Sequence, residues 1–353
     1  MKQQILALAI LSACSSMASA QSSVTMYGMV DMGVVRESGG AAGSVTKLTS
    51  GVENGSRIGF RGTEDLGGGN SAIFLLESGF QADTGAMGQG GLLFGRQAYV
   101  GLAGNWGTLT LGRQYAPNYT TMTTVGDPFV AGLAGVFSSV FANSGARMNN
   151  AVKYVSPKFN GLSGEVVYGA GEVAGDNSAS SVAGAALAYS AGTFNMRVGY
   201  HHRDNDTATV NNLSAARNTL LAMNYDWKIV KGFFAYGINK GLNSSQLANP
   251  NAYGLAVAAR PSTDSRDLLL GVTVPVGPGR MIASYIHKDD RTAFNQDASQ
   301  YAIGYSYLLS KRTDLYAAYG KISNENGASY TVNSAIDTGS GNRAFNLGMR
   351  HLF

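Results

Sequence analysis

The most constraining feature of this sequence is a repeated alternation of large apolar and small polar residues in strand-length segments between residues 24 and 353. In residues 300–307 the odd positions carry tyrosine and isoleucine, whereas the even positions carry Gln, Ala, Gly and Ser. Residues 194–201, 222–227 and 345–353 repeat this alternation. A period of two is typical of β-strands with two different faces. Because the second face is small and polar rather than rich in Lys and Glu, we interpret it as a wet, crowded interior and the apolar face as the outside.

The connections between these segments are alternately short and long. Seven short turns lie at residues 66–70, 104–107, 159–161, 190–192, 228–232, 275–279 and 309–312. Eight long loops lie at residues 36–56, 81–91, 116–147, 172–181, 203–216, 241–264, 289–297 and 323–341. Short turns at one end and long loops at the other, separating an even number of strands, are typical of outer-membrane barrels. The sequence therefore predicts an all-β fold, a transmembrane 16-stranded antiparallel β-barrel, which must close because hydrocarbon does not tolerate an open sheet edge.

The composition agrees with a barrel whose outside faces lipid. Glycine accounts for 47 of the 353 residues, tyrosine outnumbers phenylalanine 18 to 14, and only 14% of the residues are charged. This combination argues against disorder and against an ordinary solvated surface. After the first twenty residues, no segment approaches the twenty or so uninterrupted apolar residues of a membrane-spanning helix. The formal net charge of +4 is too small and too dispersed to indicate nucleic acid binding.

The first twenty residues are predicted to be a secretory signal peptide rather than part of the fold. Lys2 provides the positive region, residues 5–13 the apolar region and residues 18–20, Ala-Ser-Ala, the cleavage site. Cleavage before Cys14 is the alternative and would leave a lipidated N-terminus. Cleavage after Ala20 is favoured because the chain that follows leads directly into a strand. Cys14 is the only cysteine, which excludes an intramolecular disulfide and a cysteine metal site. Residues 21–353 are then expected to form one barrel domain.

The longest loop, residues 116–147, interrupts the alternation. Loops of this length in a compact domain are usually either functional or disordered. This one is rich in apolar residues and in Gly, Ala and Ser rather than in charged residues. We therefore expect it to pack inside the hollow that the strands build. Within it, Asp127 is placed to cap a short helix and Pro128 to begin it.

Seven motifs extend from the first predicted strand to the last. They are SVTMYG at 23–28, SRIGFRGTEDLG at 56–67, LESGF at 76–80, FGRQAYVGL at 94–102, LGRQ at 111–114, NNAVKY at 149–154 and RHLF at 350–353. Together they resemble the trimeric general-diffusion porins of Gram-negative outer membranes, most closely the anion-selective branch. The resemblance implies a homotrimer in outer-membrane lipid that passes small hydrophilic solutes and inorganic anions. It also implies that the third long loop, residues 116–147 here, folds into the lumen and sets the constriction.

The same resemblance places Arg57, Arg96 and Arg147 on the basic side of the constriction, with Lys153 as a further candidate. Fixed charges in a narrow tube raise the local concentration of the opposite ion. Arginine suits this task because it stays charged and its planar fork pairs with carboxylate or phosphate. Alternation independently points Arg57 inward, whereas for Arg96 it is equivocal. The alternative is that each arginine is a structural lumen residue bonded to loop carbonyls.

Three further residues complete the predicted sites. Glu77 is expected to face the lumen, where it would orient an arginine or balance the basic cluster. Asp127 is also assigned to the constriction, with helix capping as its alternative role. Phe353 ends an alternating strand, and in porin-like barrels the final strand is the signal that the barrel assembly machinery recognises.

No cofactor, metal site or enzymatic activity is expected. The four histidines lack metal-ligand spacing, and Gly-Gly-Gly at 67–69 lies in a turn between strands rather than before a helix. The main alternative is a substrate-specific outer-membrane channel for small anionic metabolites that uses the same arginines. A barrel that is chiefly an enzyme or an adhesin would need a catalytic constellation or a passenger domain. A soluble secreted β-protein is the remaining rival.

Overall fold

The computed structural model describes residues 23–142 and 145–353, so the predicted signal peptide and both candidate cleavage sites lie outside the described residues. The described chain is mostly strand: β1 Ser23–Gly40, β2 Gly43–Ser50, β3 Arg57–Gly67, β4 Asn70–Gly79, β5 Gln97–Gly104, β6 Gly107–Tyr115, β7 Arg147–Val155, β8 Leu162–Gly169, β9 Val182–Ala191, β10 Phe194–Arg203, β11 Ala216–Asp226, β12 Lys231–Lys240, β13 Asp264–Val276, β14 Gly279–Asp290, β15 Ala298–Leu308, β16 Thr313–Asn324 and β17 Arg343–Leu352. Within these ranges no helix is both long enough and apolar enough to cross a membrane.

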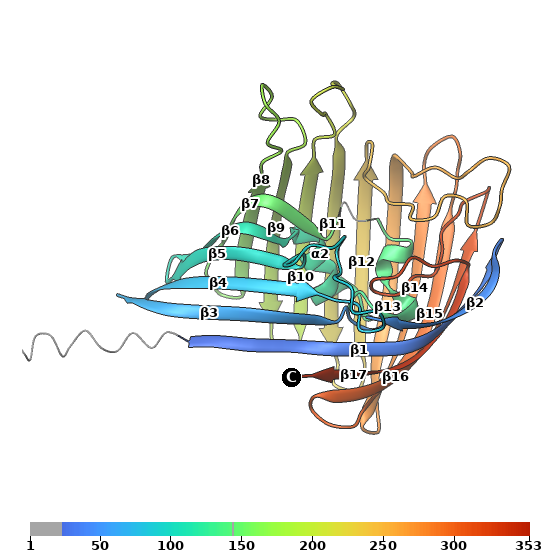
Figure 1. Cartoon of the computed structure of the whole chain (residues 1–353), viewed down its shortest axis with the longest axis horizontal. Coiled ribbons are helices and arrows are strands. Elements are labelled where there is room, and N and C mark those ends of the chain that lie inside the picture. Colours follow the sequence, from blue (N-terminus) through green and yellow to red (C-terminus); the bar gives the residue numbers. More distant parts are fainter. Residues whose placement is uncertain (1–22, 143–144) are drawn as a thin grey trace, which may run out of the picture.

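These segments form sixteen wall strands, because β2 and β3 are two parts of one strand. β2 pairs with residues 32–40 of β1, and β3 pairs with residues 23–29 of β1. From β3 onward each strand pairs antiparallel with its neighbours in sequence, and β17 pairs with β1 to close the sheet. Figure 1 shows the resulting hollow wall. The predicted closed barrel of sixteen antiparallel strands is confirmed.

The C-terminal residue lies at the closing seam. Phe353 and Gly28 exchange two backbone hydrogen bonds, each with an N to O distance of 3.0 Å. A Cβ atom at position 28 would overlap the Phe353 ring, so glycine lets the ring lie against β1. The chain end is therefore part of the barrel closure. The proposed recognition of Phe353 by the assembly machinery stays a prediction.

The two faces of the wall have the expected chemistry. Along β15, Gln300, Ala302 and Ser306 are buried, whereas Tyr301 and Ile303 are exposed on the outside. Exposed large apolar side chains recur on nearly every strand, and they include tyrosines and tryptophans near the strand ends. This outside suits hydrocarbon with aromatic residues at the membrane interfaces.

The prediction of a long first loop at residues 36–56 is wrong. β1 continues to Gly40, turns tightly, and returns as β2 to Ser50. Only residues 51–56 leave the sheet, and they bend into the lumen because the buried Asp31 carboxylate accepts the backbone N–H groups of Val52, Glu53 and Asn54 at 2.7–3.1 Å. This contact joins residues more than twenty positions apart, so local alternation does not reveal it.

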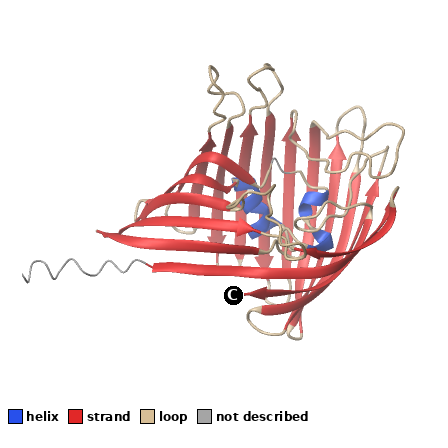
Figure 2. Ribbon diagram, in the orientation of Figure 1, coloured by secondary structure: helices blue, strands red, loops and turns tan. Residues whose placement is uncertain are grey.

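The loop between β6 and β7, residues 116–146, turns into the barrel (Figure 2) and is called the inserted loop below. It contains α2 (Pro117–Thr121), the π-helical turn η2 (Met122–Gly126) and two 3-10 turns, η3 (Leu133–Gly135) and η4 (Phe137–Ser139). The prediction that Pro128 begins a helix is wrong. Helix begins at Pro117, and Asp127 follows its last turn. After Pro128 the backbone has positive φ at Val130 and Ala131, which ends any helical run.

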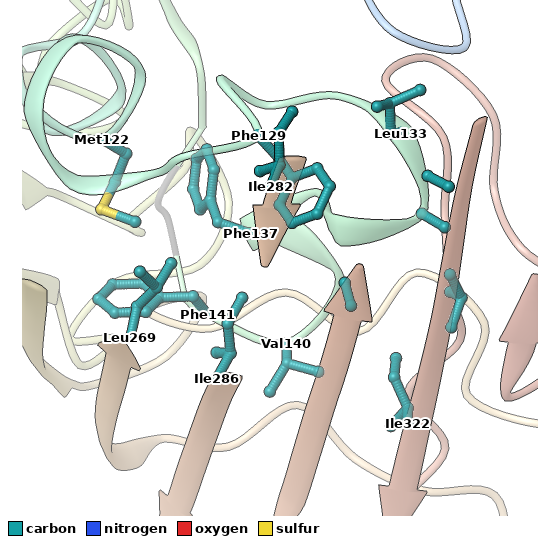
Figure 3. Close-up of a cluster of buried hydrophobic side chains, with 14 of the residues drawn as sticks. Met122, Phe129, Leu133, Phe137, Val140, Phe141, Leu269, Ile282, Ile286 and Ile322 are labelled. Atoms are coloured by element: carbon teal, nitrogen blue, oxygen red, sulfur yellow. The ribbon is translucent and has the colours of Figure 1, made fainter. Parts of the chain in front are cut away.

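Apolar packing holds the inserted loop against one side of the wall (Figure 3). Leu133 and Phe137 are almost completely buried. The cluster joins loop and wall side chains: Met122, Phe129, Val140 and Phe141 from the loop, and Leu220, Leu269, Ile282, Ile286 and Ile322 from β11, β13, β14 and β16. The expectation that this apolar loop packs inside the barrel is confirmed.

Polar contacts fix the two ends of this packed region. At one end the Leu133 N–H donates to the Val52 carbonyl at 2.7 Å. At the other end the Ala142 N–H donates to Asp267 at 2.6 Å, and Asp267 forms a fully buried ion pair with Lys288 at 2.7 Å. Residues 51–56 and the β13–β14 wall thus hold the loop in place at both ends.

Truncation of Phe137 should loosen the loop without opening the barrel. We expect Phe137→Ala to lower the free energy of unfolding by about 3–5 kcal/mol, because it leaves a cavity in the loop–wall cluster. Single-channel conductance in planar bilayers should rise, because the loop loses its central contact. Phe294→Ala is the matched control, since Phe294 lies exposed in a different loop. Equal conductance in the wild type and Phe137→Ala would contradict the loop's role in limiting the pore.

Candidate functional site: the channel constriction

A cavity of about 730 Å³ lies between the inserted loop and the wall that faces it. Arg57, Arg96, Tyr115 and Arg147 line it from the wall side. The loop side contributes Tyr119, Thr120, Thr123, Thr124, Val130 and Ser138. The structure therefore brings together the three arginines predicted from the sequence. Among the described residues that line this cavity, these arginines are the only charged ones.

Arg96 is the most tightly held of the three. Its Nε lies 2.8 Å from Glu77 Oε1, its Nη2 donates to the Tyr115 hydroxyl at 2.8 Å, and only 7% of the residue is exposed. Glu77 also accepts a hydrogen bond from the Tyr27 hydroxyl at 2.8 Å. Glu77 lies behind Arg96 and does not line the cavity. It holds the arginine in place through this ion pair. A role of Glu77 in the selectivity of the constriction stays a prediction.

The ambiguous orientation of Arg96 has a simple structural explanation. Arg96 precedes the first residue of β5, Gln97, and lies in a bend. Strand alternation therefore does not apply to it, and its backbone N–H donates to the Glu77 carbonyl at 3.1 Å. The side chain turns inward even though Val100 and Leu102, at the same parity, are exposed on the outside.

Arg147 packs beside Arg96 at the first residue of β7. Its Nε donates to the Arg96 carbonyl at 2.9 Å, and its Nη2 donates to the Tyr115 hydroxyl at 3.3 Å. The guanidinium lies over the Tyr115 ring, 4.9 Å from its centroid, and that ring stacks on Tyr119 at 5.1 Å. The bond to the Arg96 carbonyl is the contact expected if Arg147 were a structural lumen residue, which is the alternative interpretation. Its charge, however, has no carboxylate partner among the described residues.

Arg57 is the least constrained arginine. The only hydrogen bond of its side chain within the described chain runs from Nη2 to the Met29 sulfur at 3.1 Å, and its Nε has no partner. A sulfur atom is a weak acceptor, so this bond does not neutralise the guanidinium. Glu77 also acts on the charge of Arg57, but it forms its ion pair with Arg96. Arg57 and Arg147 are thus two cations that line one cavity and form no ion pair within the described chain.

Lys153 lies elsewhere on the wall. Its Nζ is 2.8 Å from Glu165 Oε2, and Glu165 also pairs with Arg197. Arg197 Nε in turn donates to the Thr121 hydroxyl of α2 at 2.9 Å. Lys153 does not line the cavity, and this network connects the root of the inserted loop to β7, β8 and β10.

Asp127 is also outside the cavity. It is 2% exposed, and its carboxylate accepts the backbone N–H groups of Phe129 at 3.0 Å and Ala131 at 2.8 Å. Burial raises the pKa of Asp127 to about 7, although these hydrogen bonds oppose the shift. Asp127 therefore stabilises a turn within the inserted loop, in keeping with its alternative role as a cap.

Sequence reasoning missed several residues that shape this site. Tyr115 accepts hydrogen bonds from two of the arginines, and Asn54 and Gly55 reach the cavity because residues 51–56 bend inward. The threonine hydroxyls of the loop donate to carbonyls of their own helical turns, as Thr124 does to Thr120 at 2.6 Å. The loop side therefore offers no charge, and the electrostatic field comes from the wall.

Comparison with known families decides what kind of channel this is. The sequence pattern of the Gram-negative porin family matches residues 7–327. The chain belongs to this family. This porin is 31% identical to an outer membrane porin protein of Bordetella pertussis and 31% identical to outer membrane porin protein 32 of Delftia acidovorans, each over 100% of both chains.

Solved structures agree with this assignment. The anion-selective porin from Comamonas acidovorans superposes with a TM-score of 0.76 at 28% identity, covering 94% of this porin and 100% of that chain. OmpF of Salmonella typhi, at 17% identity and a TM-score of 0.68 over 94% of this porin and 97% of that chain, shows the same fold. The protein is thus an outer-membrane porin that forms a water-filled channel for passive diffusion.

The titration of Asp127 should make the inserted loop sensitive to pH. The unfolded pKa is about 3.9, so a folded pKa of about 7 means that the protonated form favours folding. The stabilisation is complete below about pH 4 and is lost as the pH rises through about 7. Relative to Asp127→Asn, the wild type should lose up to about 1.4 kcal/mol per pH unit across this window.

Thermal unfolding of both proteins in detergent between pH 4 and 8 measures this difference. Asp83→Asn serves as the control, because Asp83 is an exposed residue of another loop. Parallel curves of Tm against pH for the wild type and Asp127→Asn would show that the Asp127 carboxyl is not protonated in the fold.

Proposed function

We propose that this porin prefers anions and that Arg57 and Arg147 supply most of the positive field in its constriction. The observation that carries this proposal is the cavity lined by arginines and by no acidic residue among those described. Arg96 contributes less net charge, because Glu77 lies 2.8 Å from it. The anion-selective porin from Comamonas acidovorans, 28% identical, supports the same preference.

The proposed transport needs no chemical step. A small hydrophilic solute or ion enters past the long loops, passes between the arginine wall and the uncharged face of the inserted loop, and leaves at the short-turn end. A charge fixed beside a narrow aqueous path favours ions of opposite sign along the whole path. Because the field acts on any small anion, general diffusion explains the site without a dedicated substrate.

Reversal potentials in a KCl gradient across planar bilayers test this proposal. The wild type should favour chloride, and Arg57→Gln should reduce the permeability ratio of chloride to potassium by about fivefold, since one unit charge at contact distance in water is worth about 1 kcal/mol. Arg57→Gln breaks no ion pair, and Glu77 keeps its ion pair with Arg96, so the barrel should fold normally.

Two further variants control for local structure. The double variant Arg96→Gln, Glu77→Gln removes one positive and one negative charge and should change the permeability ratio much less than Arg57→Gln. Arg36→Gln should leave it unchanged, because Arg36 is exposed on β1 and hydrogen-bonds only to Thr46. Cation preference in the wild type, or no shift in Arg57→Gln, would refute the proposal.

We also propose that the porin is a homotrimer whose contacts use the outer faces of the early strands. Val24, Phe60, Val100, Leu102 and Leu111 are exposed apolar side chains on β1, β3, β5 and β6. Such side chains serve equally well against lipid or against a second barrel, so they permit the contact without requiring it.

Light scattering of the detergent-solubilised protein measures the number of copies directly. We expect a protein mass of three chains. A protein mass of one chain, in a detergent that preserves channel activity, would contradict the trimer and leave the proposed selectivity intact.

A further inference from the structure

A second cavity, of about 320 Å³, lies at the long-loop end of the wall between β7 and β10. It forms where β7 separates from β8. The β7–β8 pairing ends at Ala151 and Gly169, whereas Arg147 and Met148 continue to pair with β6. The departure of β7 leaves a recess beside the long-loop ends of β8, β9 and β10.

His201 lines this recess, and its imidazole has no hydrogen-bond partner among the described residues. It is 2% exposed, and both of its ring nitrogens are buried without a partner among the described residues. The His201 side chain points into the barrel. Gly199, two positions earlier on the same face of β10, lies so close to Asn118 of the inserted loop that a Cβ atom there would overlap it. Buried polar atoms normally find a partner. An imidazole that lines a cavity with both nitrogens unpaired offers a donor and an acceptor to a ligand.

Two arginines make the recess electropositive. Arg203 lies two positions after His201 on the same face, and its side chain forms no ion pair or hydrogen bond within the described chain. Arg147 also lines the recess, and its Nη1 is not used in its bonds to Arg96 and Tyr115. Among the described residues that line the recess there is no Asp or Glu. The donors and charges on its wall therefore suit an anion.

We propose that this recess binds an oxyanion of the phosphate class, either inorganic phosphate or a phosphate monoester. Phosphate oxygens accept several hydrogen bonds at once. They can therefore accept from both the guanidinium of Arg203 and the imidazole N–H of His201. A phosphate hydroxyl can also donate to the second imidazole nitrogen, which a chloride ion cannot do.

The recess would act as an outer subsite for the constriction. Arg147 lines both cavities, so an anion held by Arg203 and His201 already lies beside an arginine of the narrow passage. This inference rests on the proposed anion preference and adds a site that transiently binds one chemical class of anion. A general electrostatic field would treat small anions alike, whereas this site distinguishes phosphate from chloride.

Phosphate block of the chloride current tests the subsite. Wild-type channels in KCl are titrated with inorganic phosphate, and the half-blocking concentration is compared with those of Arg203→Gln and His201→Phe. We expect an increase of about tenfold or more in each variant, since each removes a hydrogen bond to a charged group. His201→Asn, which keeps an N–H donor, should recover part of the wild-type block.

Matched controls separate binding from folding and from the constriction. Arg217→Gln should block like the wild type, because Arg217 is exposed, pairs with His202 across β10 and β11, and lines neither cavity. Phosphate-31 line broadening with detergent-solubilised protein should persist in Arg57→Gln and be lost in Arg203→Gln. Normal heat stability of each variant shows that its barrel is intact.

The outcomes distinguish this inference from the proposed function. If the reversal potential without phosphate shows chloride preference but Arg203→Gln and His201→Phe are blocked like the wild type, the subsite is refuted and the anion preference stands. Line broadening lost only in Arg57→Gln would place phosphate in the constriction and also refute the subsite. Cation preference in the wild type refutes the proposed function. In that case, loss of phosphate line broadening in Arg203→Gln still supports the subsite, and unchanged broadening refutes it.

Discussion

Closure of the sheet is the constraint on which the rest of this structure depends. In hydrocarbon an unpaired strand edge leaves backbone donors and acceptors without water, at a cost of several kcal/mol for each group. The pairing of β17 with β1, completed by the backbone bonds between Phe353 and Gly28, removes that edge. Once the sheet is closed, each strand has one face toward lipid and one toward the lumen. The alternation of large apolar and small polar residues follows directly from this geometry.

A closed barrel of sixteen strands is too wide to be filled by its own wall side chains, so the inserted loop takes up part of the interior. Apolar contacts around Phe137 hold it against β11–β16, and the Lys288–Asp267 pair and residues 51–56 fix its ends. The aqueous path is thereby displaced to the opposite wall, which carries the arginines. The hydrophobic packing of one side of the loop thus leaves the arginine-lined cavity between the other side of the loop and the facing wall.

The arginines differ in what surrounds them rather than in their chemistry. Arg96 is buried, and its Nε lies 2.8 Å from Glu77 Oε1, so a carboxylate compensates its charge. Arg57 and Arg147 form no ion pair within the described chain, and both line the cavity between the inserted loop and the wall. This division explains how a short stretch of wall can be both rigid and electropositive. In a narrow, low-dielectric channel such uncompensated charges act more strongly than they would on an open surface.

The sequence by itself determined the fold class, the number of wall strands and the position of the inserted loop, and it singled out three arginines that the structure places in one cavity. It could do so because strand periodicity and turn length are local properties and the motifs are contiguous. Only the tertiary structure decided which of those charges are free. Glu77 and Arg96 are nineteen positions apart, Asp31 binds residues 52–54 across the sheet, and Asp127 turns back on its own loop. The recess at His201 exists because β7 leaves β8, which depends on the pairing of β7 with β6. Charge compensation and cavity shape arise from contacts between distant segments, and no local pattern encodes them.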